Sequence, residues 1–374
     1  MGFLGYIGYI VVALLILMLM VTIHEFGHYI AGKLFKFKIN EFSIGFGKAL
    51  YSKKLKNGEI FSIRLVPLGG YCAFEGEDED ETKSTSEKAF NNEAWWKRLI
   101  VLFNGAFFNL ISAVIFSFVL LVSVGSGVPV INNIVATNGN ENIMQVGDVV
   151  LSVEGEEPSF INGGMPGLVA KYKAGEEIDI VVRRDGKEVP LVVTRYNNYY
   201  VNQTCKYVYY NDEYVEYEAD NVNYAGLPRY DVSLVLGITT DYYRYNAGEA
   251  LLKCVPYTFS MAVECLEVLG GLITGGVGWE SVGGPVTTIS TIASAAQTNY
   301  LNILLLLPLI AVNLGVFNLL PIPALDGARM VFVLIEGIFR KPVPRNIEAY
   351  IHSAGILLLF GFVILVDVLQ LFVF

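Results

Sequence analysis

The sequence is short of charge and short of the residues that build thiolate or disulfide frameworks. Only 17% of its 374 residues are charged, whereas 53% are hydrophobic. The four cysteines include no CxxC pair, so neither a thiolate metal site nor a disulfide framework is predicted; we expect packing roles for Cys72, Cys205, Cys254 and Cys265. The net charge of −10 excludes a general nucleic-acid binder, because such proteins need a basic surface.

Long uncharged runs are abundant instead, and they predict a polytopic α-helical membrane protein. A helix needs about 20 apolar residues to cross a bilayer core. Four stretches meet this length: residues 3–23, 99–124, 301–325 and 353–374. The first lacks the basic start and small-residue cleavage site of a signal peptide, so we interpret it as a span. Residues 247–272 mix apolar residues with Glu and Lys and predict an interfacial amphipathic helix rather than a fifth span.

The basic residues predict the orientation of these spans, because Lys and Arg concentrate in cytoplasmic loops. Residues 33–98 hold 12 basic and 10 acidic residues, whereas residues 125–300 hold 10 basic and 21 acidic residues. We therefore expect both termini and the large acidic region outside, and the loops at 33–98 and 326–350 in the cytoplasm.

The remaining segments predict β structure. Residues 39–74 alternate apolar and polar side chains around Asn57-Gly58, a strong hairpin signal, and the acidic cluster at 75–81 is typical of a solvated loop. Residues 196–245 hold 13 of the 22 tyrosines, which favours a β-rich extension with half-buried rings over a binding surface. The predicted organisation is a first span with a polar motif (1–35), the hairpin segment (36–97), a second span (98–124), a compact sheet (125–195), the tyrosine-rich extension (196–245), interfacial helices (246–298) and two last spans (299–374).

The most specific motif is His24-Glu25-Phe26-Gly27-His28, at the end of the first run. On a helix, positions i and i+4 share a face, so both imidazoles can bind one zinc ion while Glu25 reaches a water beside it as general base. If Lys33 marks the inner membrane surface, a rise of about 1.5 Å per residue places His28 about 7 Å and His24 about 13 Å deep. Ionisable groups at that depth are costly, which disfavours a mere packing role.

A catalytic zinc site needs a third protein ligand. Three side chains are candidates: Asp326, Glu336 and His352. We favour Asp326, because Pro321 and Pro323 disrupt the helix just before it and leave an irregular segment that can face a cavity.

With these motifs the chain resembles the site-2 protease family of zinc intramembrane metalloproteases, in particular the bacterial PDZ-bearing type that includes the regulator of sigma-E protease. The resemblance covers nearly the whole chain. Besides HEFGH and the LDG motif at Asp326, residues 42–47 and 66–71 are similar to the family's membrane re-entrant β segment, residues 283–286 to its GPV stretch and residues 128–195 to its PDZ domain.

The resemblance implies zinc ligation by His24, His28 and Asp326, with Glu25 as the base. It also implies that Asn318 handles substrate. Asn109 lies in a motif that usually reads Gly-Pro-x-x-Asn, with Ala106 in place of the proline, and the resemblance implies that its amide stabilises the oxyanion.

The sequence therefore predicts a zinc endopeptidase of a bacterial cytoplasmic membrane, with its active site near the cytoplasmic side and its PDZ-like domain outside. The resemblance implies that it cleaves transmembrane segments of single-span proteins, often after another protease has trimmed their exterior part. A membrane transporter is one alternative, although no inverted repeat is visible. A catalytically inactive scaffold is the other, and the presence of all four active-site groups disfavours it.

Overall fold

The structure is a computed structural model, and it describes residues 3–77, 86–125, 128–135, 140–158, 164–201, 206–211, 213–216, 223, 227–278, 282–341 and 343–372. The chain divides into a helical unit (Met1–Leu120 and Ala247–Phe374) and a β-rich unit (Leu121–Asn246). Cys205 lies outside the described residues. The other three cysteines are unpaired thiols, and two of them are buried.

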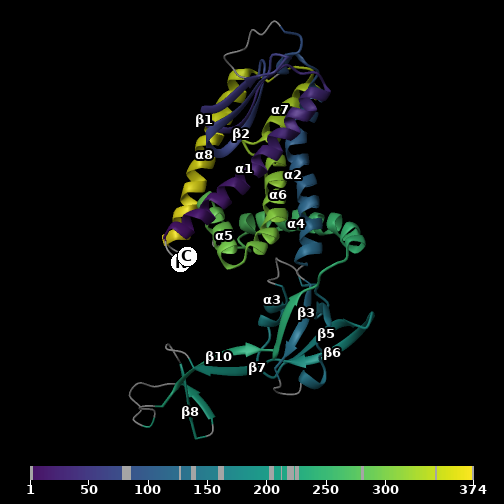
Figure 1. The fold of residues 1–374 in the computed structure, drawn as a ribbon, viewed down its shortest axis with the longest axis vertical. Helices are drawn as coiled ribbons and strands as arrows, with labels where there is room; N and C mark the ends of the chain where they lie inside the picture. The colour runs from purple at the N-terminus through teal and green to yellow at the C-terminus, as the bar shows by residue number, and fades with distance from the viewer. Residues whose placement is uncertain are drawn as a thin grey trace. The chain divides into compact units, whose positions relative to one another are not determined.

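The described part of the helical unit contains seven α-helices (Figure 1): α1 (Phe3–Leu34), α2 (Trp95–Ser123), α4 (Ala247–Thr274), α5 (Pro285–Thr298), α6 (Ile303–Leu319), α7 (Asp326–Phe339) and α8 (Arg345–Phe372). Within the described residues, five helices have the length and composition of membrane spans: α1, α2, α4, α6 and α8. Together with the β sheets they fit a polytopic membrane protein with a β domain.

The count of five differs from the four spans expected, because α4 also qualifies. The most apolar window of α4 has a mean hydropathy of only 1.2, against 2.1 to 2.5 for the others. In Figure 1, α4 runs across the direction of α2 and α6. Its buried Thr258 shares a 2.9 Å hydrogen bond with Ser117 of α2, whereas Leu252 and Phe259 are exposed. The interfacial position of α4 stays a prediction, and the direction of α4 across α2 and α6 supports it.

The third apolar run is divided, as its prolines predict. Helix α6 ends at Leu319, residues 320–325 are not helical, and α7 begins at Asp326. The turn between them requires a glycine, because a Cβ on Gly327 would lie 2.1 Å from the Leu320 carbonyl oxygen. The break thus places the Asp326 carboxylate at the start of a new helix.

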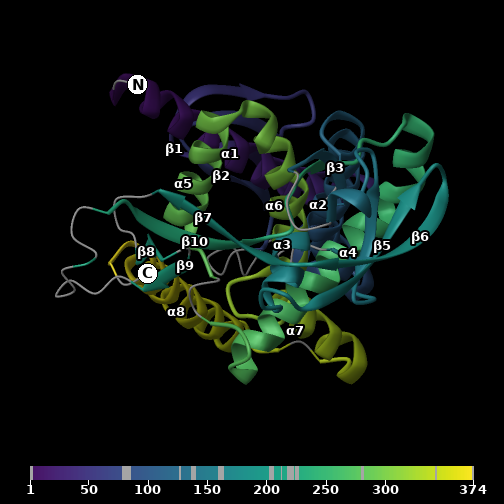
Figure 2. The same ribbon diagram turned by 90° about the horizontal axis from the view of Figure 1, so that it is seen from below.

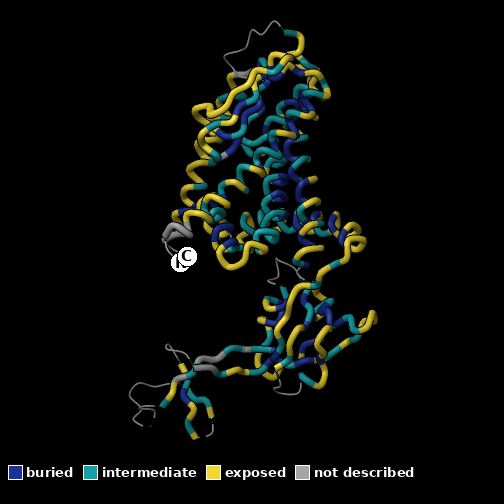
Figure 3. Tube along the Cα trace, in the orientation of Figure 1, coloured by how far each residue is buried: buried dark blue, intermediate teal, exposed yellow. Residues whose placement is uncertain are grey.

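Helix α2 is the central helix of its unit. Of its most apolar window, 44% is buried, against at most 28% in the other four apolar helices. Figure 3 shows this buried stripe along α2. One core cluster joins α1, α2 and the β hairpin through Ala31, Phe42, Leu102 and Val333 of α7.

The hairpin consists of β1 (Ile39–Lys54) and β2 (Ile60–Phe74), joined through the predicted Asn-Gly turn. Both strands bend, and the first half of β1 has a β2 partner on each side. Ile44, for example, pairs with Gly70 and with Ile63. The first half of β1 is therefore internal, and the last residues of β2 form one edge of the sheet in the described part of the chain.

The β-rich unit contains a five-stranded sheet of order β11-β3-β4-β5-β6, with the short helix α3 (Gly164–Ala170). The strands are β3 (Pro129–Ile134), β4 (Val149–Val153), β5 (Glu177–Arg184), β6 (Lys187–Thr194) and β11 (Ile238–Tyr242). Strand β11 comes from the segment predicted as the tyrosine-rich extension. That segment therefore departs from the sheet and returns to complete it, which sequence spacing alone does not reveal.

The tyrosine-rich segment itself forms a second sheet of order β7-β10-β8-β9. Its strands are β7 (Tyr196–Val201), β8 (Tyr207–Tyr210), β9 (Glu213–Glu216) and β10 (Arg229–Val235). Strands β7 and β10 pair along a two-stranded ribbon that is visible in Figure 1 and Figure 2. The rings of Tyr199 and Tyr214 stack with centroids 3.6 Å apart, so these tyrosines pack on one another.

Candidate active site

The HEFGH motif lies on the face of α1 that packs against α2. A Cβ on Gly27 would come within 2.2 Å of the Asn104 carbonyl oxygen. A Cβ on Gly105 of α2 would lie 2.4 Å from His28 Nε2 and 2.8 Å from His24 Cε1. One glycine from each helix therefore lets the two backbones approach and brings α2 against both imidazoles.

The side chain of Asp326 meets the Nε2 atoms of both histidines. Its Oδ2 lies 2.9 Å from His24 Nε2 and 3.1 Å from His28 Nε2, and the two Nε2 atoms are 3.2 Å apart. Both histidines are buried, with 8% and 7% of their surface exposed. His24 and Asp326 are 302 positions apart in the sequence, and the fold brings three atoms that could bind a metal to one point.

These three groups fit zinc. Ligands about 2.0–2.1 Å from a tetrahedral zinc ion lie about 3.3 Å from one another, close to the 2.9, 3.1 and 3.2 Å that separate these three atoms. Two imidazoles and one carboxylate also form the donor set of a catalytic site, which leaves one position for water or substrate. Gly105 leaves space beside His28 Nε2 and His24 Cε1 that a side chain would fill.

The second nitrogen of each imidazole points away from this cluster and meets α2. His28 Nδ1 lies 2.9 Å from the Val101 carbonyl oxygen, and His24 Nδ1 lies 3.2 Å from Nδ2 of Asn109. Val101, Gly105 and Asn109 are spaced four residues apart, so they form one stripe on α2. Asn109 is fully buried, and its Oδ1 has no hydrogen-bond partner among the described residues.

Glu25 lies beside His24, His28 and Asp326 without belonging to their cluster. Its Oε2 accepts a 3.0 Å hydrogen bond from the backbone N–H of Cys72, at the edge of β2. A cavity of about 360 Å³ connects these groups; it is lined by His24, Glu25, His28, Asp326, Arg329, Glu77, Phe90, Leu102 and residues 71–74. Two imidazoles, the carboxylates of Glu25 and Asp326 and a strand edge therefore face one space, an arrangement that suits metal-assisted peptide hydrolysis.

Comparison with known proteins agrees with this chemistry. The model of peptidase family M50 matches residues 12–362, a range that includes every group described above. The chain belongs to peptidase family M50. Among its relatives are proteins of Fusobacterium nucleatum (30% identity over 96% of each chain), Helicobacter pylori strain J99 (30% over 97% of each) and Campylobacter jejuni (28% over 96% of this chain and 92% of the relative), each provisionally named a zinc metalloprotease.

This M50 peptidase is thus a metalloprotease of the site-2 protease family, and its metal is zinc. Of the alternatives open from the sequence, the family supports a protease over a transporter.

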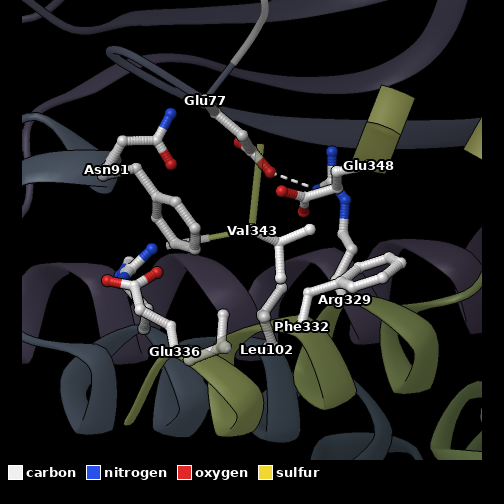
Figure 4. Close-up of a pocket in the computed structure, with 11 residues that line it drawn as sticks. Glu77, Asn91, Leu102, Arg329, Phe332, Glu336, Val343 and Glu348 are labelled. Carbon is white, nitrogen blue, oxygen red and sulfur yellow. Dashed lines mark hydrogen bonds and ion pairs between the residues drawn. The ribbon is translucent and has the colours of Figure 1, made fainter. Parts of the chain in front are cut away.

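A second, smaller cavity of about 30 Å³ adjoins the active-site cavity in this peptidase, and the two share Glu77, Phe90, Leu102 and Arg329 as lining residues. Figure 4 shows Glu77 and Arg329 pointing toward one another, with Glu348 of α8 beside them. The Glu77 carboxylate pairs with the Arg329 guanidinium and also accepts a 3.3 Å hydrogen bond from the Phe74 N–H. Glu77 therefore ties the end of β2 to α7, one turn after Asp326.

The other candidate ligands have different partners. Glu336 pairs with the buried Arg98 of α2 and so fastens α7 farther along its length. His352 of α8 accepts a 3.2 Å hydrogen bond at Nδ1 from the Ala324 N–H, in the segment that leads to Asp326. Asn318 donates to the Leu314 carbonyl oxygen at 2.9 Å and is not among the described residues that line the active-site cavity. Its role in substrate handling stays a prediction.

Several residues around the site carried no recognisable signal in the sequence. Glu77 belongs to the acidic cluster predicted to be solvated, yet it forms an ion pair inside a cavity wall. Gly105 belongs to the motif around Asn109, but the motif does not indicate its contact with the imidazoles. Val101 acts through its backbone carbonyl, which no side-chain pattern reveals.

Proposed function

We propose that this peptidase hydrolyses peptide bonds within the transmembrane segments of single-span membrane proteins. The position of the site supports this proposal most directly. His24, Glu25 and His28 lie within a 28-residue helix segment whose length and hydropathy suit a membrane span. A substrate that reaches this site does so from within the apolar layer. Such cleavage is the step that regulated intramembrane proteolysis requires.

The roles of the residues follow from their chemistry. His24, His28 and Asp326 would hold zinc, which when bound lowers the pKa of water and polarises a carbonyl oxygen. Glu25 takes the proton from the attacking water and gives it to the leaving amine, while the Cys72 N–H keeps its carboxylate oriented. Buried Phe74 and Phe90 restrict solvent around the reaction.

The edge of β2 is the proposed docking site for the substrate backbone. A transmembrane helix hides its carbonyl groups in internal hydrogen bonds and must unwind before hydrolysis. An extended segment can then pair with a sheet edge. Residues 70–74 form such an edge beside Glu25. The sequence alternation does not distinguish this edge from β1 at Ile44, but Ile44 pairs on both sides and cannot accept a further strand.

We place the peptidase in a bacterial cytoplasmic membrane, with its active site toward the cytoplasm and the β-rich, PDZ-like unit outside. The excess of acidic residues in 125–300 and the basic loop at 33–98 support this orientation. An exterior unit cannot supply catalytic groups, but it can exclude substrates whose exterior part is still bulky. A first cut by another protease would then precede cleavage.

The test reconstitutes the purified protein in vesicles with a single-span substrate. We expect cleavage that chelation abolishes and zinc restores, with the cut mapped inside the span. A cut outside the span would contradict intramembrane action. Replacing residues 126–244 by a short linker should let untrimmed substrates be cleaved; if they stay resistant, size exclusion is not the function of the exterior unit.

A further inference from the structure

We propose that Asn109 is a positioning residue for the zinc ligand His24, and that it acts through its carbonyl oxygen as a hydrogen-bond acceptor. The inference rests on the zinc site proposed above. It assigns Asn109 a different role from the oxyanion contact that the family resemblance implies.

The two ring nitrogens of His24 face different partners. Its Nε2 is the atom that converges with His28 Nε2 and Asp326 Oδ2, so Nε2 must present a lone pair to the metal. A neutral imidazole carries its proton on the other nitrogen, and His24 Nδ1 is therefore a donor in the zinc-bound state. His28 satisfies the same requirement, because its Nδ1 lies 2.9 Å from the Val101 carbonyl oxygen, a pure acceptor.

The amide of Asn109 is the corresponding partner of His24. Its Nδ2 lies 3.2 Å from His24 Nδ1, while its Oδ1 is buried without a partner among the described residues. Two donors face each other in this arrangement once Nδ1 is protonated. Turning the amide by 180° exchanges its oxygen and nitrogen, so that Oδ1 accepts the Nδ1–H and the orphaned acceptor gains a partner. Zinc binding therefore selects the amide orientation with Oδ1 toward His24.

The position of Asn109 also favours the orientation of His24 over a contact with the oxyanion. Asn109 reaches the nitrogen of His24 that faces away from the ligand cluster, one helical turn beyond Gly105. An oxyanion donor must instead point at the reacting carbonyl. Orientation of a metal-binding imidazole by a second hydrogen bond typically changes metal affinity about tenfold to a hundredfold.

The experiment measures zinc affinity of the full-length protein by competition with a chelator, without substrate, together with kcat at saturating zinc. Asn109→Leu should weaken zinc binding about tenfold to a hundredfold. Asn109→Asp, which keeps an acceptor and loses the donor, should bind zinc at least as tightly as the wild type and keep kcat within a few fold. Asn104→Leu is the matched control on the same helix: the Asn104 side chain bonds only its own helix, at the Ile100 carbonyl oxygen, and should leave affinity unchanged.

Wild-type zinc affinity in Asn109→Leu would overturn the proposal. So would normal zinc binding by Asn109→Asp with kcat reduced about a hundredfold, which is the signature of a lost oxyanion donor. If Asn109→Leu does not fold, the Asn109→Asp result still decides between acceptor and donor. Because affinity is measured without substrate, these outcomes are distinct from a failure of the protease assignment, which the Glu25 variant tests.

Discussion

The backbone N–H of Cys72 donates to Oε2 of Glu25 at 3.0 Å, so a hydrogen bond joins the edge of β2 to the carboxylate proposed as the catalytic base. Through this bond, the strand that we propose to present substrate would also orient the proposed base. It also brings the edge of β2, rather than the first half of β1, to the cavity beside Glu25.

Cys72→Pro should therefore lower cleavage while zinc stays bound. Proline removes the N–H, and loss of a hydrogen bond to a charged group costs about 1.5–3 kcal/mol, or about tenfold to a hundredfold in kcat/KM. Cys72→Ala is the matched control, since it removes the thiol and keeps the N–H. Equal activity of the two variants would show that the bond to Glu25 does not matter.

The third zinc ligand is tested by three variants. Loss of a group that hydrogen-bonds to a metal ligand typically weakens metal binding roughly tenfold to a hundredfold. Asp326→Asn alters a proposed ligand itself and should weaken zinc binding by more than that. Glu336→Gln should keep its zinc, because Glu336 pairs with Arg98. His352→Ala should also keep zinc but lower activity modestly, because the Ala324 N–H loses its acceptor. Metal lost from the His352 variant and kept in the Asp326 variant would reverse the assignment.

Gly105 offers a test of the space around the metal. Gly105→Ala places a Cβ 2.4 Å from His28 Nε2, so the imidazole or α2 must shift. We expect zinc affinity to fall at least tenfold, about the smallest effect of changing a group that orients a metal ligand. Gly361→Ala is the control in α8, where no described atom lies within 4 Å of the new Cβ. Wild-type affinity in both variants would mean that α2 does not confine the imidazoles as closely as we infer.

Much of this site could be predicted from the sequence because its signals are local. The HEFGH spacing fixes three groups on one helix face, and Pro321 and Pro323 mark the break that frees Asp326. Length and hydropathy likewise revealed four of the five apolar helices; α4 stands apart because its charged residues lower its hydropathy.

What the sequence did not reveal depends on long-range packing. The bend of β1 lets Ile44 pair on both sides, and no alternation pattern distinguishes an internal strand from an edge strand. In the sequence Glu77 is one of several charges in an acidic cluster, and its ion pair with Arg329 of α7 depends on the fold. The return of β11 to the first sheet likewise requires a partner, β3, that lies more than 100 residues earlier.

The β-rich unit provides a prediction about pH. Asp148 is buried and accepts hydrogen bonds from Arg184 at 2.7 and 2.6 Å and from the Gln145 N–H at 2.9 Å. Burial alone would raise the pKa of Asp148, but these donors outweigh it and hold the pKa below its usual range. Such a group stabilises the fold above its unfolded pKa of about 3.9, and this stability is lost as the pH falls through the folded pKa.

Asp148→Asn should accordingly lower the free energy of unfolding of this unit by about 2 kcal/mol at pH 7, and the difference from the wild type should shrink below about pH 3.9. Hydrogen exchange of the β4 and β5 amides in the full chain measures this. Asp185→Asn, in the exposed turn between β5 and β6, is the control. Unchanged protection at pH 7 in the Asp148 variant would refute the role of the pair with Arg184.

The Glu25→Gln variant, measured for zinc content and for cleavage of a single-span substrate in vesicles, tests whether this site is a zinc protease with Glu25 as its base. Glu25 adjoins the ligands without being one, so the variant should bind zinc like the wild type. Loss of the base should lower turnover about a hundredfold to ten-thousandfold. Cleavage near the wild-type rate by the zinc-loaded variant would contradict the assignment of Glu25 as the catalytic base.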